Sequence, residues 1–189
     1  MPSVTGPRSS SSEGPVRWTP RSVGPGSTWA RRLWDWRPER SYGGSGGAGL
    51  GYGLGASIGV ALAHRDSGRL CIDLQSDGDL LYVLGGLYTL THNRLPLLVV
   101  MCNNRSYYND EEHQERMARA RGRPVENKGV GIRIDDPAPD FAKIAQGFGI
   151  YAEGPIEDPA MLQPALKRAL RVVTDERRPA LIDAVIQPR

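Results

Sequence analysis

Residues 76–106 read SDGDLLYVLGGLYTLTHNRLPLLVVMCNNRS, and this stretch decides the fold. It opens on a short acidic turn, Ser76 to Asp79, and closes just after an amide pair, Asn103 and Asn104. Between them, apolar residues at helical spacing precede the continuous apolar run PLLVVMC, which is typical of a strand covered on both faces. A further short apolar strand is expected directly before the turn. The stretch therefore predicts a right-handed strand–helix–strand unit with parallel strands.

The rest of the chain continues this alternation. Strands are expected at 69–75, 96–102, 150–153 and 179–186, and helices at 54–63, 80–92, 109–119, 140–149 and 159–173. Gly85 and Gly86 weaken the helix at 80–92 by about 1 kcal/mol each. Asp158 is expected to cap the last helix, with Pro159 at its first position. The alternation predicts a doubly wound α/β fold, with a mostly parallel sheet and helices on both faces.

Composition limits the class of protein. A chain of 189 residues with 39% hydrophobic content has room for one domain with a real core. The net charge is +3, without a dense Lys/Arg block, so a nucleic-acid partner is not indicated. The two cysteines lie in apolar strands, which suggests a reducing compartment. Without a long apolar segment or a secretion signal, we expect a cytoplasmic protein with no membrane partner.

The N-terminal segment differs from the rest. Residues 1–28 are rich in Ser, Pro, Gly and Arg, which predicts a disordered tail before a domain at 29–189. Trp29, Trp34 and Trp36 follow among arginines. Packing of these rings onto the domain edge is favoured over a stacking surface for nucleic-acid bases.

A glycine-rich segment, GGSGGAGLGYG at 43–53, leads into a helix of small residues. The backbone of such a segment can approach a ligand closely. A dinucleotide-binding loop is a weak interpretation, because no strand precedes the glycines. A flexible linker is also disfavoured, because the glycines run without a break into an apolar helix.

Polar residues follow the carboxyl ends of two strands predicted to be adjacent and parallel, where open sheets bind ligands. Asp77 offers a carboxylate, Asn104 an amide oxygen and Ser106 a backbone carbonyl, which together suit Mg²⁺ that also binds phosphate oxygens. The backbone N–H groups of Gly78 and Asp79 would point at the phosphates. Each turn alone is more simply an ordinary strand-end turn. The two together, with 24 residues between the Gly78 and Asn-Asn positions, favour a magnesium–diphosphate site.

These residues resemble the cofactor-binding (PP) domain of thiamine-diphosphate enzymes, whose signature is Gly-Asp-Gly, a spacer and Asn-Asn. The likeness is greatest to the acetolactate synthase large subunits, which share a Gly-Tyr-Gly loop after a bulky apolar residue, matched at 49–53. It covers about residues 29–189, including the helix that starts near Asp140 and the closing strand. Two positions depart from the pattern: Ser76 stands where glycine is usual, and Asp79 where Ser or Ala is common.

The resemblance implies thiamine diphosphate and Mg²⁺ as cofactors, with the metal held by the three oxygens named above. It places Gly78 and Asp79 at the diphosphate and Gly49 in the cofactor loop. Ala48 would accept a hydrogen bond from the aminopyrimidine through its carbonyl. Leu50 would be the apolar residue wedged beneath the cofactor, although its place in the sequence suits a buried helix-start residue equally well.

The resemblance also implies a second half. The glutamate that activates the cofactor belongs to a PYR domain, normally contributed by another subunit, and the acids upstream, Glu13, Asp35 and Glu39, lie in nothing that resembles one. We therefore expect a chain that is inactive alone and needs a PYR-bearing subunit or a homo-oligomeric partner. Together they would form a lyase, decarboxylase or carboligase acting on a small 2-oxo acid.

Two other classes of function stay open. A nucleotide-binding α/β module of an oxidoreductase would use the glycine-rich segment and would bind nicotinamide or flavin without Mg²⁺. A non-catalytic interaction domain would use the basic segment 115–133 as its partner surface.

Overall fold

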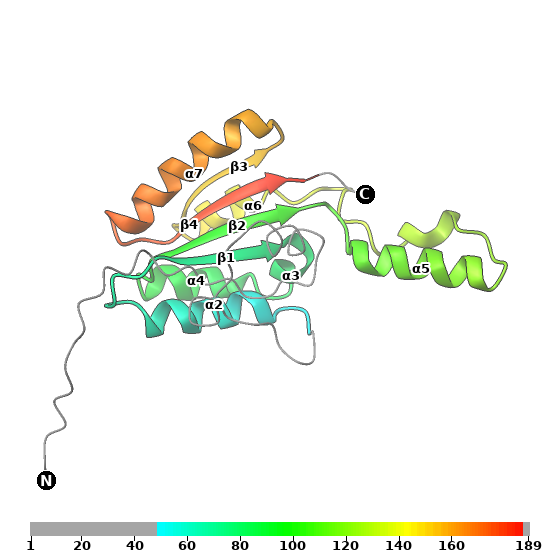
Figure 1. Cartoon of the computed structure of the whole chain (residues 1–189), viewed down its shortest axis with the longest axis horizontal. Helices are drawn as coiled ribbons and strands as arrows, with labels where there is room; N and C mark the ends of the chain where they lie inside the picture. The colour runs from blue at the N-terminus through cyan, green and yellow to red at the C-terminus, as the bar shows by residue number, and fades with distance from the viewer. Residues whose placement is uncertain (1–48, 187–189) are drawn as a thin grey trace, which may run out of the picture.

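Four parallel strands form the centre of the molecule. The structure is a computed structural model, and it describes residues 49–186. The strands are β1 (Cys71–Ser76), β2 (Leu97–Asn103), β3 (Tyr151–Ile156) and β4 (Ala180–Val185). Their order in the sheet is β1-β2-β4-β3, and every neighbouring pair is parallel (Figure 1). The parallel sheet predicted from the apolar runs is confirmed. Residues 1–48, with the predicted tail and tryptophan segment, lie outside the described residues.

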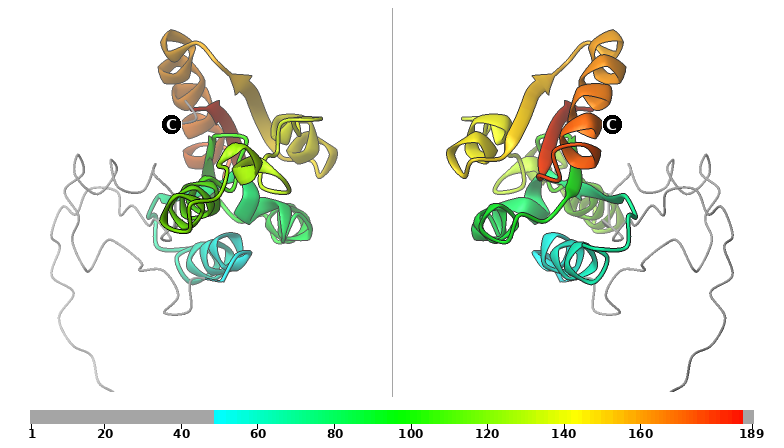
Figure 2. Two further views of the ribbon diagram at one scale, coloured as in Figure 1. Left: turned by 90° about the vertical axis from the view of Figure 1, so that its right-hand side faces the viewer. Right: turned by 90° about the vertical axis from the view of Figure 1, so that its left-hand side faces the viewer.

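Helices cover both faces of the sheet, as predicted. They are α2 (Tyr52–Ala63), α3 (Asp77–Leu81), α4 (Gly85–His92), α5 (Tyr108–Ala120), the 3-10 helix η2 (Glu126–Gly129), α6 (Phe141–Gly147) and α7 (Pro159–Thr174). Figure 2 shows α7 on one side of the sheet and α2 and α4 on the other. The first residues of α6 pack into the same core as α2 and α4, so α7 covers its face alone among the described helices.

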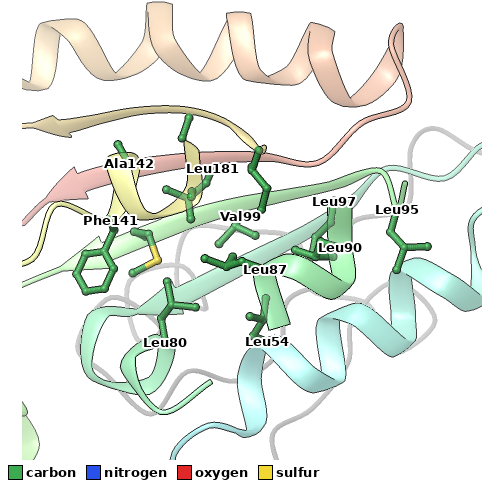
Figure 3. Close-up of a cluster of buried hydrophobic side chains, with 14 of the residues drawn as sticks. Leu54, Leu80, Leu87, Leu90, Leu95, Leu97, Val99, Phe141, Ala142 and Leu181 are labelled. Carbon is green, nitrogen blue, oxygen red and sulfur yellow. The ribbon is translucent and has the colours of Figure 1, made fainter. Parts of the chain in front are cut away.

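Alternation along β2 explains the two layers. Leu97, Val99 and Met101 point into the core under α2, α4 and α6, and Leu98 points towards α7. Successive residues of a strand face opposite sides, so a fully apolar strand can fill both cores. In the larger core, shown in Figure 3, the labelled side chains come from helices and strands, apart from Leu95, which lies in the loop before β2. Full burial of each large side chain contributes about 1.5–3 kcal/mol.

The single helix predicted at 80–92 is wrong. The chain forms two helices there, α3 and α4, and α3 begins directly at the end of β1, where a turn was expected. A β-carbon on Gly86 would lie 2.7 Å from Leu54 Cδ2, so glycine lets α4 pack closely against α2. Tertiary packing thus accounts for one of the two glycines that the sequence marks as helix-weakening.

Two peripheral helices have well-defined ends or contacts. Asp158 caps α7 as predicted, because its Oδ1 accepts the Ala160 N–H at 2.9 Å. Helix α5 extends beyond the carboxyl ends of the strands (Figure 1) and buries only Glu111. Lys128 Nζ of η2 lies 2.6 Å from Glu115 Oε2 of α5, which ties these two elements together.

Among residues 49–186, no helix has the length and apolar character needed to cross a membrane.

Candidate functional site

Asp77 stands where β1 ends and α3 begins, at the carboxyl edge of the sheet. Its side chain is buried, with the residue only 1% exposed. Oδ1 accepts the Gly78 N–H at 2.9 Å, and Oδ2 accepts the Ser106 N–H at 3.2 Å. The second bond crosses to the chain that leaves β2, so Asp77 joins two strand ends.

Asn104 and Ser106 occupy the turn after β2. The Ser106 N–H also donates to Asn104 Oδ1 at 3.1 Å, so one N–H group contacts both predicted side-chain ligands. Arg105 between them has a φ of 57°, which directs the chain back towards α3. Its carbonyl accepts the Ile134 N–H at 2.8 Å, which anchors the turn to the loop before α6. The structure thus brings together the three residues predicted to hold a metal, called here the strand-end cluster: Asp77, Asn104 and Ser106.

Asn103 supports this turn from below. Its Nδ2 donates to Asp183 Oδ1 of β4 at 3.0 Å, and its Oδ1 accepts the Arg105 N–H at 3.2 Å. Asn103 and Asp183 are both buried, and burial raises the pKa of Asp183 against the opposing effect of the Asn103 hydrogen bond. Sequence reasoning missed Asp183. An acid inside the apolar run PALIDAVI was the signal available.

The electrostatics of Asp77 suit a cation. Burial raises its pKa, while the hydrogen bonds from the backbone N–H groups of Gly78 and Ser106 oppose that shift. No cationic side chain of residues 49–186 pairs with Asp77 within salt-bridge distance. A carboxylate has about four acceptor sites, so two accepted bonds leave capacity for a metal. Because burying an unpaired carboxylate is costly, a bound cation would stabilise this arrangement.

The donor set also suits Mg²⁺ in particular. The strand-end cluster combines one carboxylate with an amide oxygen and a backbone carbonyl, and Mg²⁺ is usually bound by one or two carboxylates together with substrate phosphates. In the described part of the chain, no group of three or more His, Cys, Asp or Glu residues could hold a metal ion. The three oxygens of the strand-end cluster are hard donors, so they fit a hard ion that takes its remaining ligands from a phosphate group and water.

Tyr107 covers the first turn of α3. A β-carbon on Gly78 would lie 2.6 Å from Cδ1 of the Tyr107 ring, and closer still to Cε1. The Tyr107 hydroxyl donates to the Gly78 carbonyl at 3.3 Å, and its ring meets that of Tyr82 edge to face, with centroids 6.3 Å apart. A side chain at position 78 would therefore displace this ring, and glycine leaves room for it. Nothing in the sequence singled out Tyr107.

Asp79, also predicted at the diphosphate, turns its side chain away from the strand-end cluster. Its Oδ1 accepts the Gly51 N–H at 2.7 Å, and its Oδ2 accepts Gln75 Nε2 at 2.5 Å. The extra carboxylate at this position therefore points towards the start of α2. Sequence reasoning assigned only the Asp79 backbone N–H to the site and missed Gln75.

The loop before α2 is the other predicted cofactor contact. Leu50 is 45% exposed, so the interpretation as a buried helix-start residue is wrong. Gly49 is exposed too, and a β-carbon there would meet nothing within 4 Å. Ala48 lies outside the described residues. Residues 49–51 are called the glycine loop below.

Asp73 of β1 is fully buried on the α2 side of the sheet, next to Ser57. Its carboxyl oxygens accept no hydrogen bond from any described residue. Burial raises its pKa to about 7, which the neighbouring Ser57 hydroxyl opposes and the charge of Asp79 reinforces. This carboxyl therefore holds its proton far more strongly than an ordinary aspartate.

Comparison with known proteins shows which family this chain resembles. Residues 22–184 match the family described as thiamine pyrophosphate enzyme, C-terminal TPP binding domain. A protein of Mycobacterium tuberculosis named as the acetolactate synthase large subunit IlvX is 33% identical over 141 residues, which is 74% of this chain and 26% of that protein.

Two solved structures share the fold. The thiamine diphosphate-dependent 4-hydroxybenzoylformate decarboxylase of Rhodococcus jostii RHA1 is 26% identical with a TM-score of 0.63, over 78% of this chain and 25% of that one. Benzoylformate decarboxylase of Polynucleobacter necessarius superposes with a TM-score of 0.70 at 20% identity, over 95% of this chain and 31% of that one. The chain thus spans about a quarter of the length of the curated relative. On the family match over residues 22–184, with which its parallel sheet agrees, this chain belongs to the C-terminal TPP-binding domains of the thiamine pyrophosphate enzymes.

Proposed function

We propose that this chain binds thiamine diphosphate with Mg²⁺, as the PP half of an acetolactate synthase-like enzyme acting on 2-oxo acids. The observation that carries the proposal is the shared Ser106 N–H, which draws Asp77 Oδ2 and Asn104 Oδ1 to one point. Two parallel strands thus deliver a carboxylate and an amide oxygen to the same edge of the sheet, without a cationic side chain from residues 49–186.

In this proposal Asp77, Asn104 and the Ser106 carbonyl hold the metal, which in turn holds the diphosphate. The first turn of α3, at Gly78 and Asp79, lies beside the strand-end cluster and would contact the phosphate groups. Thiamine diphosphate supplies the electron sink that bond cleavage next to a 2-oxo group requires.

The glycine loop would carry the other end of the cofactor. The exposed Leu50 side chain would support it from below, with Gly49 close by and the Ala48 carbonyl as acceptor for its aminopyrimidine.

The proposal includes a second domain. The chain spans 26% of the curated relative and 25% of the Rhodococcus structure, so most of each of those proteins has no counterpart in this sequence. We propose that a PYR domain with the activating glutamate comes from another subunit, or from another part of a longer protein. Substrate turnover then needs both halves, and this chain alone would show no lyase or transferase activity on pyruvate.

Isothermal titration calorimetry with thiamine diphosphate, with and without Mg²⁺, tests the proposal. Binding by the whole chain should need Mg²⁺ and should be lost in Asp77→Ala. Asp66→Ala is the matched control, because the Asp66 side chain is 89% exposed. This substitution removes the same charge far from the strand-end cluster. Binding that does not depend on Mg²⁺ would favour a nucleotide-binding module. If thiamine diphosphate does not bind at all, an interaction domain would be favoured. Turnover of pyruvate by this chain alone would refute the need for a second domain.

A further inference from the structure

The carboxylate of Asp79 connects its own helix to the end of the preceding strand and to the distant start of α2. Asp79 lies in α3, Gln75 near the end of β1, and Gly51 at the start of α2. Both carboxylate oxygens are used, one for the Gly51 N–H at 2.7 Å and one for Gln75 Nε2 at 2.5 Å. Asp79 and Gln75 are 7% and 1% exposed, so water competes little for these bonds. Hydrogen bonds to a charged acceptor are among the stronger ones in proteins.

The start of α2 is shaped to this carboxylate. Gly51 has a φ of 87°, a left-handed conformation that favours glycine. A β-carbon on Gly53 would lie 2.5 Å from Asp79 Oδ2 and 2.7 Å from Gln75 Oε1, so the first turn of α2 rests directly on the pair. The backbone before and after Tyr52 is therefore fitted to Asp79.

Asp77 and Asp79 point in different directions from one short helix. Asp77 binds the turn after β2, whereas Asp79 binds the glycine loop. Helix α3 consequently holds the strand-end cluster and the glycine loop at a fixed separation. A loop already ordered in its bound conformation costs less entropy when a ligand binds.

We infer that Asp79 is a positioning residue, which fixes the glycine loop to the metal-binding edge through its bond to the Gly51 N–H. This link between Asp79 and the Gly51 N–H, called the Asp79 bridge, is seen in the contacts above. Its effect on cofactor affinity rests on the proposed function. Asp79→Ala removes both bonds. Asp79→Asn is the conservative control, because its amide can accept from Gly51 and donate to Gln75 Oε1 once the Gln75 amide rotates.

Amide hydrogen exchange of the whole chain, followed by NMR, tests the bridge without any cofactor. Exchange at Gly51 should rise about ten- to hundredfold in Asp79→Ala, as expected for the loss of a hydrogen bond to a charged group. It should stay near the wild-type rate in Asp79→Asn, and the amide of Leu98 in β2 should be unchanged in both. If the alanine variant does not fold, Asp79→Ser, whose hydroxyl is one bond too short, takes its place. An unchanged Gly51 rate, or an equal rise at Leu98, would overturn the inference.

Calorimetry then tests the consequence for the cofactor. The Mg²⁺-dependent affinity for thiamine diphosphate should fall at least about tenfold in Asp79→Ala and recover in Asp79→Asn, since the loop must then be ordered on binding. Equal affinity in wild type and Asp79→Ala would overturn the positioning role. If wild type binds no thiamine diphosphate, the proposed function fails, while the exchange experiment still decides whether the bridge exists.

Discussion

Replacing Gly78 with alanine should destabilise the fold by about 1–3 kcal/mol, the usual cost of forcing an extra methyl group into a packed site. The new β-carbon would lie 2.6 Å from Cδ1 of Tyr107 and 3.0 Å from its Cζ. The ring would have to swing out, losing its edge-to-face contact with Tyr82 and its hydrogen bond to the Gly78 carbonyl. Without the ring, the same substitution should be neutral or stabilising by up to about 1 kcal/mol, because alanine is the better helix former.

A double-mutant cycle with Tyr107→Ala isolates this contact. Urea denaturation of the four proteins, with midpoints and slopes compared, gives each free energy of unfolding. The coupling energy between positions 78 and 107 is the difference between the two effects of Gly78→Ala, with and without the ring, and it should be about 1–4 kcal/mol. Gly59→Ala is the control, because a β-carbon at this position within α2 meets nothing within 4 Å. A cost for Gly78→Ala that is the same with and without Tyr107, to within about 0.5 kcal/mol, would refute the reasoning.

Three further substitutions test other contacts. The pKa of Asp73 in the folded protein, about 7, lies above its unfolded value, so the free energy of unfolding should fall as pH rises from about 4 to 7. Urea denaturation across this pH range should show a smaller fall in Asp73→Asn. The same dependence on pH in wild type and Asp73→Asn would count against this prediction. Asp183→Ala should cost about 1–3 kcal/mol by leaving Asn103 Nδ2 buried without an acceptor, whereas Asp183→Asn, which keeps one, should cost less; equal costs by the same assay would contradict this. Asp158→Ala should cost about 1 kcal/mol in the same assay through loss of the bond from the Ala160 N–H, and no loss would show that the cap is dispensable.

Much of the site could be predicted because parallel strands share an orientation. Once the apolar runs at 69–75 and 96–102 were interpreted as neighbouring parallel strands, the residues after them had to meet at one edge. The register, which pairs Ser76 with Cys102, places Asp77 and the Asn-Asn turn there. The layered fold followed in the same way, because β2 is apolar on both faces. The break between α3 and α4 was missed, because it depends on how α4 packs against α2.

The sequence by itself determined the alternation of strands and helices and the two strand ends that carry Asp77 and Asn104, since both depend on local periodicity. Only the tertiary structure decided which side chains support them. Asp79 reaches Gly51 across 28 positions, Tyr107 reaches Gly78 across 29, and Asn103 reaches Asp183 across 80. Periodicity gives the face on which a residue lies, but the partner of a side chain depends on which distant segment packs beside it.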